Sequence, residues 1–390
     1  MTIDLTGYEI VDSHCHPFLP EKETEGFEQY FTLSMLPMRT EDMKNTLLYR
    51  MMLKELARVL ELGEEAKESK VLEKRYSLYR SNPREYIARL FSEARIESLI
   101  LDIGYPSEEF TGYSIDMKEF LSILRGTKVN YIVRIEPMIN RLLKQELRFS
   151  EFVNQFTGQL DAEIKKHKAV AVKSIIAYLT GLGVEKVTME EARKGYDEYL
   201  AQKNDFKAEK LCRDYLFWLT LEICIKWDIP LQLHTGMGDS PVFDLRLSNP
   251  LSLYNIISDD YFQKSKIVLV HAGYPYVAEA GYLANNYPNV WVDISEVNPF
   301  ASIGVEPKLL ELMESAPLTK IMYGSDGFMI PEIFWFGGIF FKKVLSRVLG
   351  KLVNEEIISL DYAHWIARSI LKDNAQSLYQ LQTQKKSESL

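Results

Sequence analysis

Cysteine is scarce in this chain of 390 residues, which contains only Cys15, Cys212 and Cys224. An odd and sparse set of cysteines does not build the disulfide framework of a small secreted protein, and it fits a reducing compartment. The chain also lacks an apolar run of about 18 residues, the length that a membrane-spanning helix needs. Residues 1–8 show neither the basic nor the apolar region of a secretory signal peptide. We therefore expect a cytoplasmic protein with no membrane partner.

The chain also has no excess of positive charge. Lys and Arg number 46 against 55 Asp and Glu, which gives a formal net charge of −9. Because an acidic surface repels phosphate backbones, this composition argues against nucleic acid as a partner. Hydrophobic residues make up 46% of the chain and charged residues 26%, which is the balance of a globular protein with a large core. A small molecule is the expected partner, and the composition leaves a homo-oligomer open.

Short apolar runs recur along the chain and end in polar residues or glycine. Several are almost continuously hydrophobic, which is typical of parallel strands buried on both faces. Helix-like stretches at 251–262, 276–287 and 307–315 separate the later runs, and this alternation predicts an α/β fold. Eight strands favour a (β/α)8 TIM barrel over the alternative, a doubly wound open sheet. The eight runs are residues 8–14, 98–104, 130–136, 169–174, 229–234, 266–271, 290–294 and 320–325.

Two connections between the runs are too long to be plain crossovers. Residues 17–97 are rich in Leu, Met, Glu and Lys and predict a helical insertion, most clearly at 41–62. Residues 178–227 hold a charged stretch followed by an amphipathic helix. Because both connections follow a strand, both are expected over the C-terminal mouth of the barrel, the first as a lid subdomain. Residues 334–381 add C-terminal helices to what we expect to be a single domain.

His14 and His16 end the first apolar run, within the segment VDSHCH. Alternate residues of a strand point to the same face, so these two imidazoles can reach a single metal ion. Cys15 lies between them and would point to the opposite face, as a small buried side chain. Taken alone, this pair leaves a metal site and a merely polar strand end equally open.

Other polar residues stand at the same position of later runs. His234, His271 and Asp326 each come where an apolar run stops and glycine begins, and Lys173 ends the fourth run. The ends of parallel barrel strands open onto one face, so these side chains are expected to gather with His14 and His16 around a divalent metal. The alternative is a set of ordinary core or loop histidines. Lys173 could be a carbamylated bridge between two metals, an ammonium that pairs with an anion, or a lysine extending from the barrel rim.

Arg134 and Glu136 end the third run. Alternation would put both on one face, where Arg134 could bind a substrate carboxylate in bidentate fashion while Glu136 orients it. A structural ion pair at the barrel mouth is the alternative. Asp102 ends the second run and is expected behind the ligands. Tyr178, which opens the second long connection, is a third expected substrate contact.

As an ordered set, these motifs resemble the metal-dependent amidohydrolase superfamily. In detail they are similar to its amidohydrolase-2 branch, which includes the amidohydrolase part of nodulin/glutamine-synthetase-like and FluG proteins. The resemblance spans nearly the whole chain, and it is specific as a set although no single motif is. The motifs are VDSHCH at 11–16, VKSIIAY at 172–178, HTGMGD at 234–239, HAGYP at 271–275, GSD at 324–326 and NA at 374–375.

The resemblance implies a barrel enzyme that activates water to hydrolyse an amide C–N bond or a related bond, such as an ester, in a small carboxylate-bearing substrate. It suggests amides of the γ-glutamyl type. His14 and His16 would hold the metal, and Asp326 would be a ligand that also takes a proton from water. In two-metal members a carbamylated lysine, here Lys173, bridges the ions, while His234 and His271 hold the second one. In one-metal members His234 binds the metal and His271 polarises the substrate.

The sequence leaves open whether the site holds one metal ion or two. Zinc suits imidazole and carboxylate ligands, and manganese or iron would also fit. The main alternative activity is that of a metal-dependent, non-oxidative decarboxylase of the same branch, which is a lyase. A catalytically silent barrel that serves as an interaction module is a third alternative, against which the complete ligand set argues.

Overall fold

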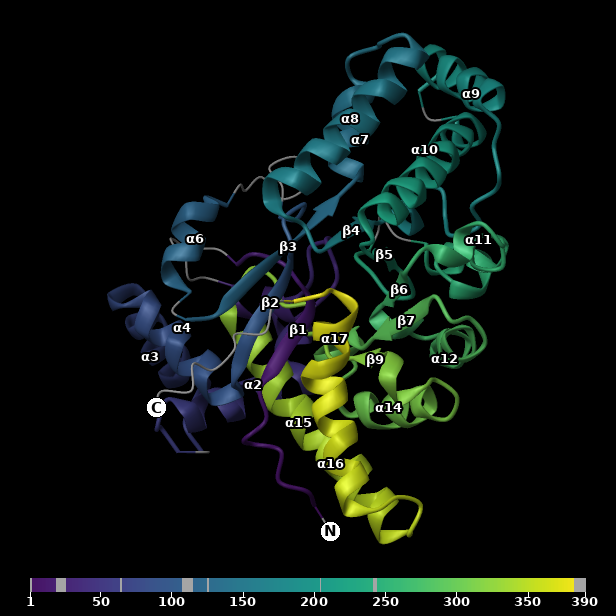
Figure 1. Cartoon of the computed structure of the whole chain (residues 1–390). Helices are drawn as coiled ribbons and strands as arrows, with labels where there is room; N and C mark the ends of the chain where they lie inside the picture. Colours follow the sequence, from purple (N-terminus) through teal and green to yellow (C-terminus); the bar gives the residue numbers. More distant parts are fainter. Residues whose placement is uncertain are drawn as a thin grey trace, which may run out of the picture.

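The structure is a computed structural model that describes residues 2–18, 26–63, 65–106, 115–124, 126–203, 205–240 and 244–381. Within these residues eight strands form one parallel sheet in the order β1-β2-β3-β4-β5-β6-β7-β9, with helices around its outside (Figure 1). This is the predicted (β/α)8 barrel. The strands are β1 (Ile10–Cys15), β2 (Ile96–Asp102), β3 (Lys128–Arg134), β4 (Ala171–Ser174), β5 (Leu231–His234), β6 (Ile267–Val270), β7 (Val290–Asp293), the two-residue β8 (Ser295–Glu296) outside the sheet, and β9 (Ile321–Met322).

Backbone hydrogen bonds join the first strand to the segment that follows the last strand. Ser13 N donates to Tyr323 O over 3.1 Å, and Asp326 N donates to His14 O over 3.0 Å. The other strands pair with their neighbours in sequence order. These bonds bring the two edges of the sheet together into a nearly closed barrel, so the open doubly wound sheet is excluded.

Side chains inside the barrel form an apolar layer below a polar one. The apolar layer packs against the C-terminal helix α17 (Asn374–Leu378), which contributes Ala375 and Leu378 together with the following Tyr379. Figure 1 shows α17 in yellow beside β1. The helix therefore fills the barrel at the end opposite to the mouth, and this leaves the polar layer to line the mouth. The apolar layer consists of Val11, Ile100, Ile132, Ala171, Val268, Val270 and Met322.

A β-bulge in β1 allows the two histidines to face the interior. The ladder pairs Asp12 with Leu99 and Cys15 with Leu101, so β1 advances three residues while β2 advances two. Strict alternation from the inward-facing Val11 would turn residue 14 outward. The extra residue of the bulge shifts this phase, so His14 points inward and Cys15 points into the outer core, as expected.

The helices largely follow the predicted pattern, including an insertion after β1 and additional helices after β9. The stretches expected at 276–287 and 307–315 are the helices α12 and α14. The α-helices are α1 (Thr40–Lys44), α2 (Leu47–Val59), α3 (Glu68–Ser81), α4 (Pro83–Ala94), α6 (Met117–Ile123), α7 (Glu136–Leu143), α8 (Phe149–His167), α9 (Met189–Ala201), α10 (Phe206–Trp227), α11 (Tyr254–Ile257), α12 (Val277–Asn286), α13 (Val297–Phe300), α14 (Val305–Met313), α15 (Pro331–Asn354), α16 (Leu360–Arg368) and α17.

Two expected helices are broken. The stretch 251–262 is the short α11 between two 3-10 turns, because Ser258 Oγ and Asp259 Oδ1 bond to nearby backbone groups that a longer helix would use. The stretch 41–62 is divided into α1 and α2, because Thr46 begins a new helix by accepting a hydrogen bond from Tyr49 N over 3.2 Å. No helix in the described part of the chain combines the length and the apolar character needed to cross a membrane.

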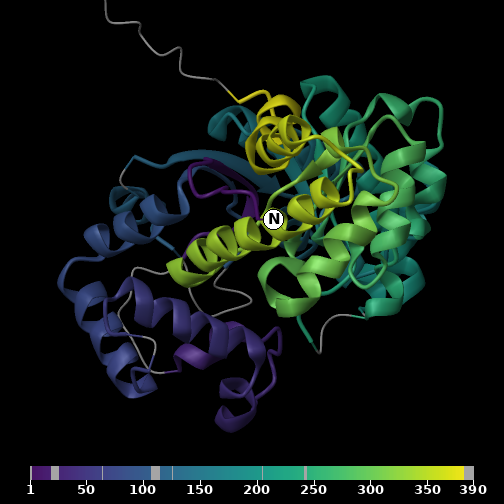
Figure 2. The same ribbon diagram turned by 90° about the horizontal axis from the view of Figure 1, so that it is seen from below.

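A buried ion pair joins the insertion to the barrel. The long helix α15 lies between the insertion helices and the rest of the barrel (Figure 2). Arg75 of α3 donates to Glu332 of α15 over 2.6 Å and 3.2 Å, and Tyr86 Oη donates to the same carboxylate over 2.7 Å. The side chains of Arg75 and Glu332 are 1% and 0% exposed. This contact fixes the insertion relative to the barrel mouth.

Replacing Glu332 with Ala should lower the free energy of unfolding by about 3–5 kcal/mol, because Arg75 stays buried without its carboxylate. Equilibrium unfolding in urea measures this change. The matched control is Glu61→Ala, because the side chains of Glu61 and its partner Arg89 are 78% and 40% exposed, and an exposed pair contributes about 1 kcal/mol at most. Equal effects of the two substitutions would contradict the structural role of the buried pair.

Candidate metal centre

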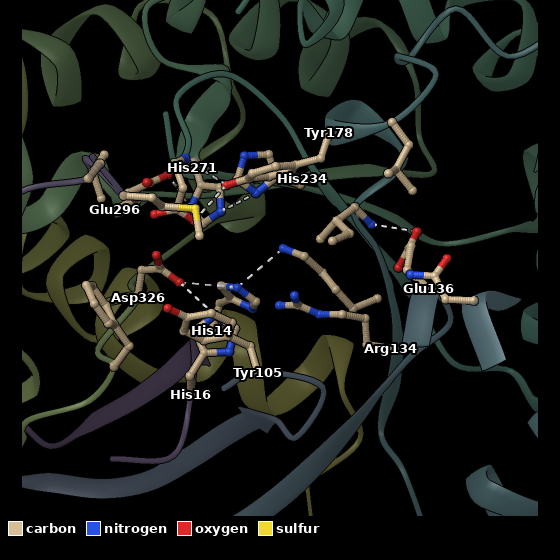
Figure 3. A pocket seen from close by; sticks show the side chains of 18 residues that line it. His14, His16, Tyr105, Arg134, Glu136, Tyr178, His234, His271, Glu296 and Asp326 are labelled. Carbon is tan, nitrogen blue, oxygen red and sulfur yellow. Dashed lines mark hydrogen bonds and ion pairs between the residues drawn. The ribbon is translucent and has the colours of Figure 1, made fainter. Parts of the chain in front are cut away.

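All nine residues that the sequence predicts to bind the metal or the substrate line one cavity of about 220 Å³ at the C-terminal mouth of the barrel. His14, Lys173 and His234 come from the ends of β1, β4 and β5, and His271 and Asp326 follow β6 and β9. Figure 3 shows the histidines and Asp326 turned toward a common space. The remaining members of the set are His16, Arg134, Glu136 and Tyr178.

One group in the cavity consists of two imidazoles and one carboxylate. Nε2 of His14 and Nε2 of His16 each lie 3.3 Å from Oδ1 of Asp326. Oδ1 is buried and has no hydrogen-bond partner among the described residues. The carboxylate of Asp102 also comes near both histidines, but its oxygens accept hydrogen bonds from Arg134 and from Gly104 N. Asp326 is therefore the carboxylate that is available to a cation here.

A second group lies beside the first, and its His271 also comes near His14 and Asp326. Nε2 of His271 lies 3.1 Å from Nδ1 of His234, and Nδ1 of His271 lies 3.6 Å from Oε2 of Glu296. The candidate ligand atoms of His234, His271 and Glu296 all lie within 4.8 Å of one another, and those of His14, His271 and Asp326 do so too. Two neighbouring cation positions are therefore geometrically available.

Sequence reasoning missed Glu296, although its side chain is only 3% exposed and its Oε2 has no hydrogen-bond partner among the described residues. It follows the seventh run by two residues and precedes no glycine, so the pattern that marked the other ligands does not mark it. Asp239, which closes the motif HTGMGD, also lines the cavity and was not expected there.

Burial keeps three histidines of the cavity, His14, His234 and His271, neutral. It lowers the pKa of His14 and His234 well below the usual value, and the nearby Lys173 lowers both further. The pKa of His271 is also well below its usual value because of burial and then because of His234. Neutral imidazoles offer lone pairs to a metal, so the nitrogen donors are in the form that coordination requires.

The pKa values of Glu296 and Lys173 are shifted in the directions that favour their neutral forms. Burial, followed by repulsion from Asp326 and Asp239, raises the pKa of Glu296 well above its usual value. Burial and the neighbouring Arg134 lower the pKa of Lys173 to about 8, and its Nζ lies 3.3 Å from His14 Nε2. A divalent cation would relieve the repulsion between these carboxylates. The orphaned oxygen of Asp326 and the neutral imidazoles therefore fit a bound metal ion.

Three of the candidate ligands have left-handed backbone conformations, with φ of 67° at His271, 61° at Glu296 and 49° at Asp326. Such angles are unfavourable for residues other than glycine and persist only where surrounding contacts enforce them. Val270 faces the barrel interior, so alternation alone would turn the next residue outward, and the left-handed turn brings His271 back. The loop that carries Asp326 is anchored by Asp12, whose Oδ1 accepts Ser325 N over 2.9 Å.

The expected pairing of Arg134 with Glu136 is wrong. Arg134 Nε and Nη2 donate to Oδ2 of Asp102 over 2.8 Å and 2.6 Å. Glu136 begins helix α7, so the alternation of β3 ends at Arg134 and does not extend to it. Asp102 therefore orients the guanidinium, and Glu136 Oε1 instead accepts hydrogen bonds from Ser174 Oγ and Ile175 N.

Tyr178 lies over the second cluster. Its ring packs edge-on against that of His234 with centroids 4.6 Å apart. Its hydroxyl donates to Asp239 Oδ2 over 3.2 Å and accepts from Asp239 N over 3.0 Å. These contacts hold the glycine-rich loop after β5 against the cavity.

A hydrogen-bonded chain below the cavity fixes the protonation of His14. Gln232 Nε2 donates to Ser13 O over 2.9 Å and to Tyr379 Oη over 2.7 Å. Because a backbone carbonyl only accepts, the NH₂ group of Gln232 must face it, and Oε1 then faces Nδ1 of His14 at 2.8 Å. Nδ1 of His14 consequently carries the proton, and the lone pair of Nε2 points into the cavity.

Comparisons with known proteins agree on one family. A family model described as Amidohydrolase matches residues 115–381. Protein fluG of Emericella nidulans is 31% identical to this chain over 288 residues, which is 66% of this chain and 33% of fluG. The chain thus spans about a third of the length of this curated relative.

Two solved structures share the fold over almost their whole length. A Lactobacillus casei protein described as a metal-dependent hydrolase is 26% identical, with a TM-score of 0.84 and coverage of 97% of this chain and 98% of that one. Uronate isomerase of Thermotoga maritima is 16% identical, with a TM-score of 0.70 and coverage of 96% and 95%. The second likeness concerns the fold alone.

Replacing Gln232 with Met should weaken metal binding by about 10- to 100-fold, since partners that orient a ligand have effects of this size. Competition with a chelator of known affinity measures the change. Nitrogen NMR of the His14 ring should show a loss of the single tautomer in the metal-free protein. Gln263→Met, at an exposed position before β6, is the matched control. Unchanged affinity and an unchanged tautomer in Gln232→Met would rule out this role.

Proposed function

Because this chain belongs to the amidohydrolase family, we propose that it is a metal-dependent hydrolase that uses water to cleave an amide bond in a small, carboxylate-bearing substrate. The observation that carries the proposal is the position of Asp326 Oδ1, which lies 3.3 Å from each of two imidazole nitrogens and has no hydrogen-bond partner among the described residues. Such a carboxylate can bind a cation and accept a proton from water.

The proposed metal is zinc, which suits imidazole and carboxylate ligands. His14, His16 and Asp326 would hold one ion, and His234 and His271 a second, with Glu296 or a carbamylated Lys173 completing the set. A bound divalent cation lowers the pKa of coordinated water from about 16 toward about 7 and polarises carbonyl groups. Metal analysis of the zinc-loaded protein counts the ions.

The side chains of the cavity supply the remaining steps. Asp326 accepts the proton of the attacking water and returns it to the departing amine. His271, which lies between the two clusters, is placed to stabilise the oxyanion or to hold the second ion. Arg134 receives the substrate carboxylate, and its pairing with Asp102 fixes its orientation before substrate binds.

The insertion supplies part of the cavity wall, which supports its role as a lid. Leu33 and Met35 line the cavity. Met35 N donates to Ser240 O over 2.8 Å, and Ser240 N donates to Leu33 O over 3.1 Å. The segment after β1 is thereby joined to the loop after β5 across the mouth. Excluding bulk water at this point strengthens every electrostatic interaction inside.

Replacing Asp326 with Asn should reduce kcat at least about 10²- to 10⁴-fold, the usual contribution of a general acid–base group, and leave the circular dichroism spectrum unchanged. Turnover of a panel of carboxylate-bearing amides measures the effect. Asp228→Asn, at a surface position whose side chain is 70% exposed, is the matched control. An Asp326→Asn variant with normal turnover would remove the basis of the proposal.

The same assay separates hydrolysis from decarboxylation. Hydrolysis releases an amine and a carboxylic acid, whereas the alternative lyase activity releases carbon dioxide. Both products should be followed for each compound of the panel. Carbon dioxide without amine would identify the protein as a decarboxylase and contradict the hydrolase proposal.

A further inference from the structure

A buried chain of hydrogen bonds ends on the ring of His271. Asp293, the last residue of β7, is fully buried, and its Oδ1 accepts His271 N over 3.2 Å and Ser295 N over 2.9 Å. The Oγ of Ser295 contacts the same Oδ1 and also lies 3.0 Å from Nδ1 of His271. The serine hydroxyl therefore connects the carboxylate to the imidazole.

The direction of each hydrogen bond follows from groups that can only donate or only accept. A backbone N–H only donates, so Oδ1 of Asp293, which faces two of them, is an acceptor. The Ser295 hydroxyl gives its single hydrogen to this oxygen, and only the lone pairs of Oγ remain for His271. The carbonyl oxygen of Ser295, which lies 3.3 Å from Nδ1, also accepts only. Nδ1 of His271 therefore carries the hydrogen of the ring.

The other nitrogen of this ring faces the neighbouring histidine. Burial and then His234 lower the pKa of His271 well below its usual value, so the ring is neutral and Nε2 holds a lone pair. Nε2 lies 3.1 Å from Nδ1 of His234, and Figure 3 shows the two rings next to each other. Nε2 of His234 lies 2.6 Å from Met237 O and so carries the hydrogen of that ring. Two lone pairs thus face each other, which a cation bound by both nitrogens would stabilise.

A purely structural role does not account for the Ser295 hydroxyl. The two backbone N–H groups that Asp293 accepts already close the turn after β7. Ser295 also packs against the loop of Asp326, since a Cβ placed on Gly324 would lie 2.6 Å from the Cβ of Ser295. An alanine would keep these backbone bonds and this packing. The hydroxyl is therefore the part of the residue whose contacts act on His271.

We propose that Asp293 and Ser295 are positioning residues that fix the orientation and the tautomer of His271. This inference rests on the proposed hydrolase function, and it decides between the two roles that His271 has there. A neutral ring whose Nδ1–H is bound by Ser295 has no hydrogen on Nε2 with which to stabilise an oxyanion. His271 therefore serves the second ion as a ligand through Nε2.

Nitrogen NMR of the histidine rings tests the tautomer in the metal-free protein. His271 should show a single tautomer with the hydrogen on Nδ1, and Ser295→Ala should show both tautomers. Asp293→Asn should keep the single tautomer, because its amide oxygen accepts the same hydrogen bonds without a charge. Ser265→Ala is the matched control, since Ser265 is equally buried and donates to Phe262 O over 2.6 Å. A hydrogen on Nε2, or an unchanged tautomer in Ser295→Ala, would overturn the proposal.

Zinc binding gives a second readout. Ser295→Ala should weaken the affinity for the second zinc ion by about 10- to 100-fold, the usual effect of losing a partner that orients a ligand. The first ion, bound by His14, His16 and Asp326, should keep its affinity, and Ser265→Ala should change neither. Competition with a chelator of known affinity measures both. Binding of only one zinc ion, or equal affinities in Ser295→Ala and the unsubstituted protein, would contradict the assignment of this ring as a ligand.

These outcomes can be distinguished from the outcome for the proposed reaction. Turnover of amides by a protein whose His271 carries the hydrogen on Nε2 would leave the hydrolase function intact and reject this role of Asp293 and Ser295. A single Nδ1–H tautomer that depends on Ser295, in a protein that hydrolyses no amide, would support the positioning residues and reject hydrolysis.

Discussion

Crowding of buried carboxylates at the barrel mouth is the constraint to which the rest of this structure responds. Asp326, Glu296 and Asp239 face one cavity, where burial and mutual repulsion raise the pKa of Glu296 well above its usual value and that of Asp239 to about 6. Asp326 N is hydrogen-bonded to His14 O, and Asp239 is hydrogen-bonded to the Tyr178 hydroxyl, so these two residues are held at the cavity. A divalent cation would remove the repulsion, so an arrangement that is unfavourable without metal would favour a bound ion.

Residues below the cavity, as well as those around it, hold the side chains of the site in position. The bulge in β1 turns His14 inward, and Gln232 sets which of its nitrogens carries the proton. Tyr379, just after the last helix, completes the contact with Gln232. Residues from the beginning, the middle and the end of the chain thus converge on one imidazole. The C-terminal helix therefore fills the lower end of the barrel and also positions a residue that supports the site.

Local periodicity and the topology of parallel strands were enough to predict the barrel and most of its candidate ligands. His234 and Asp326 could be assigned because each stands where an apolar run meets glycine, and a barrel gathers all such ends. Glu296 could not be found, since its left-handed backbone is imposed by tertiary contacts. The partner of Arg134 needed the register of β2 against β3, which places Asp102 beside it where Glu136 was expected. The role of Gln232 could not be predicted either, because in the sequence it is one more residue of an apolar strand.

The position of Lys173 restricts its chemical form once a cation is bound. Its Nζ lies 3.3 Å from Nε2 of His14, the nitrogen whose lone pair points into the cavity. An ammonium group there would compete with the metal for this lone pair and would repel the ion directly. Burial and Arg134 already lower the pKa of Lys173 to about 8, so deprotonation to the neutral amine requires little free energy. Metal binding and a charged Lys173 therefore oppose each other, and the complete site favours either the free amine or its negatively charged carbamate.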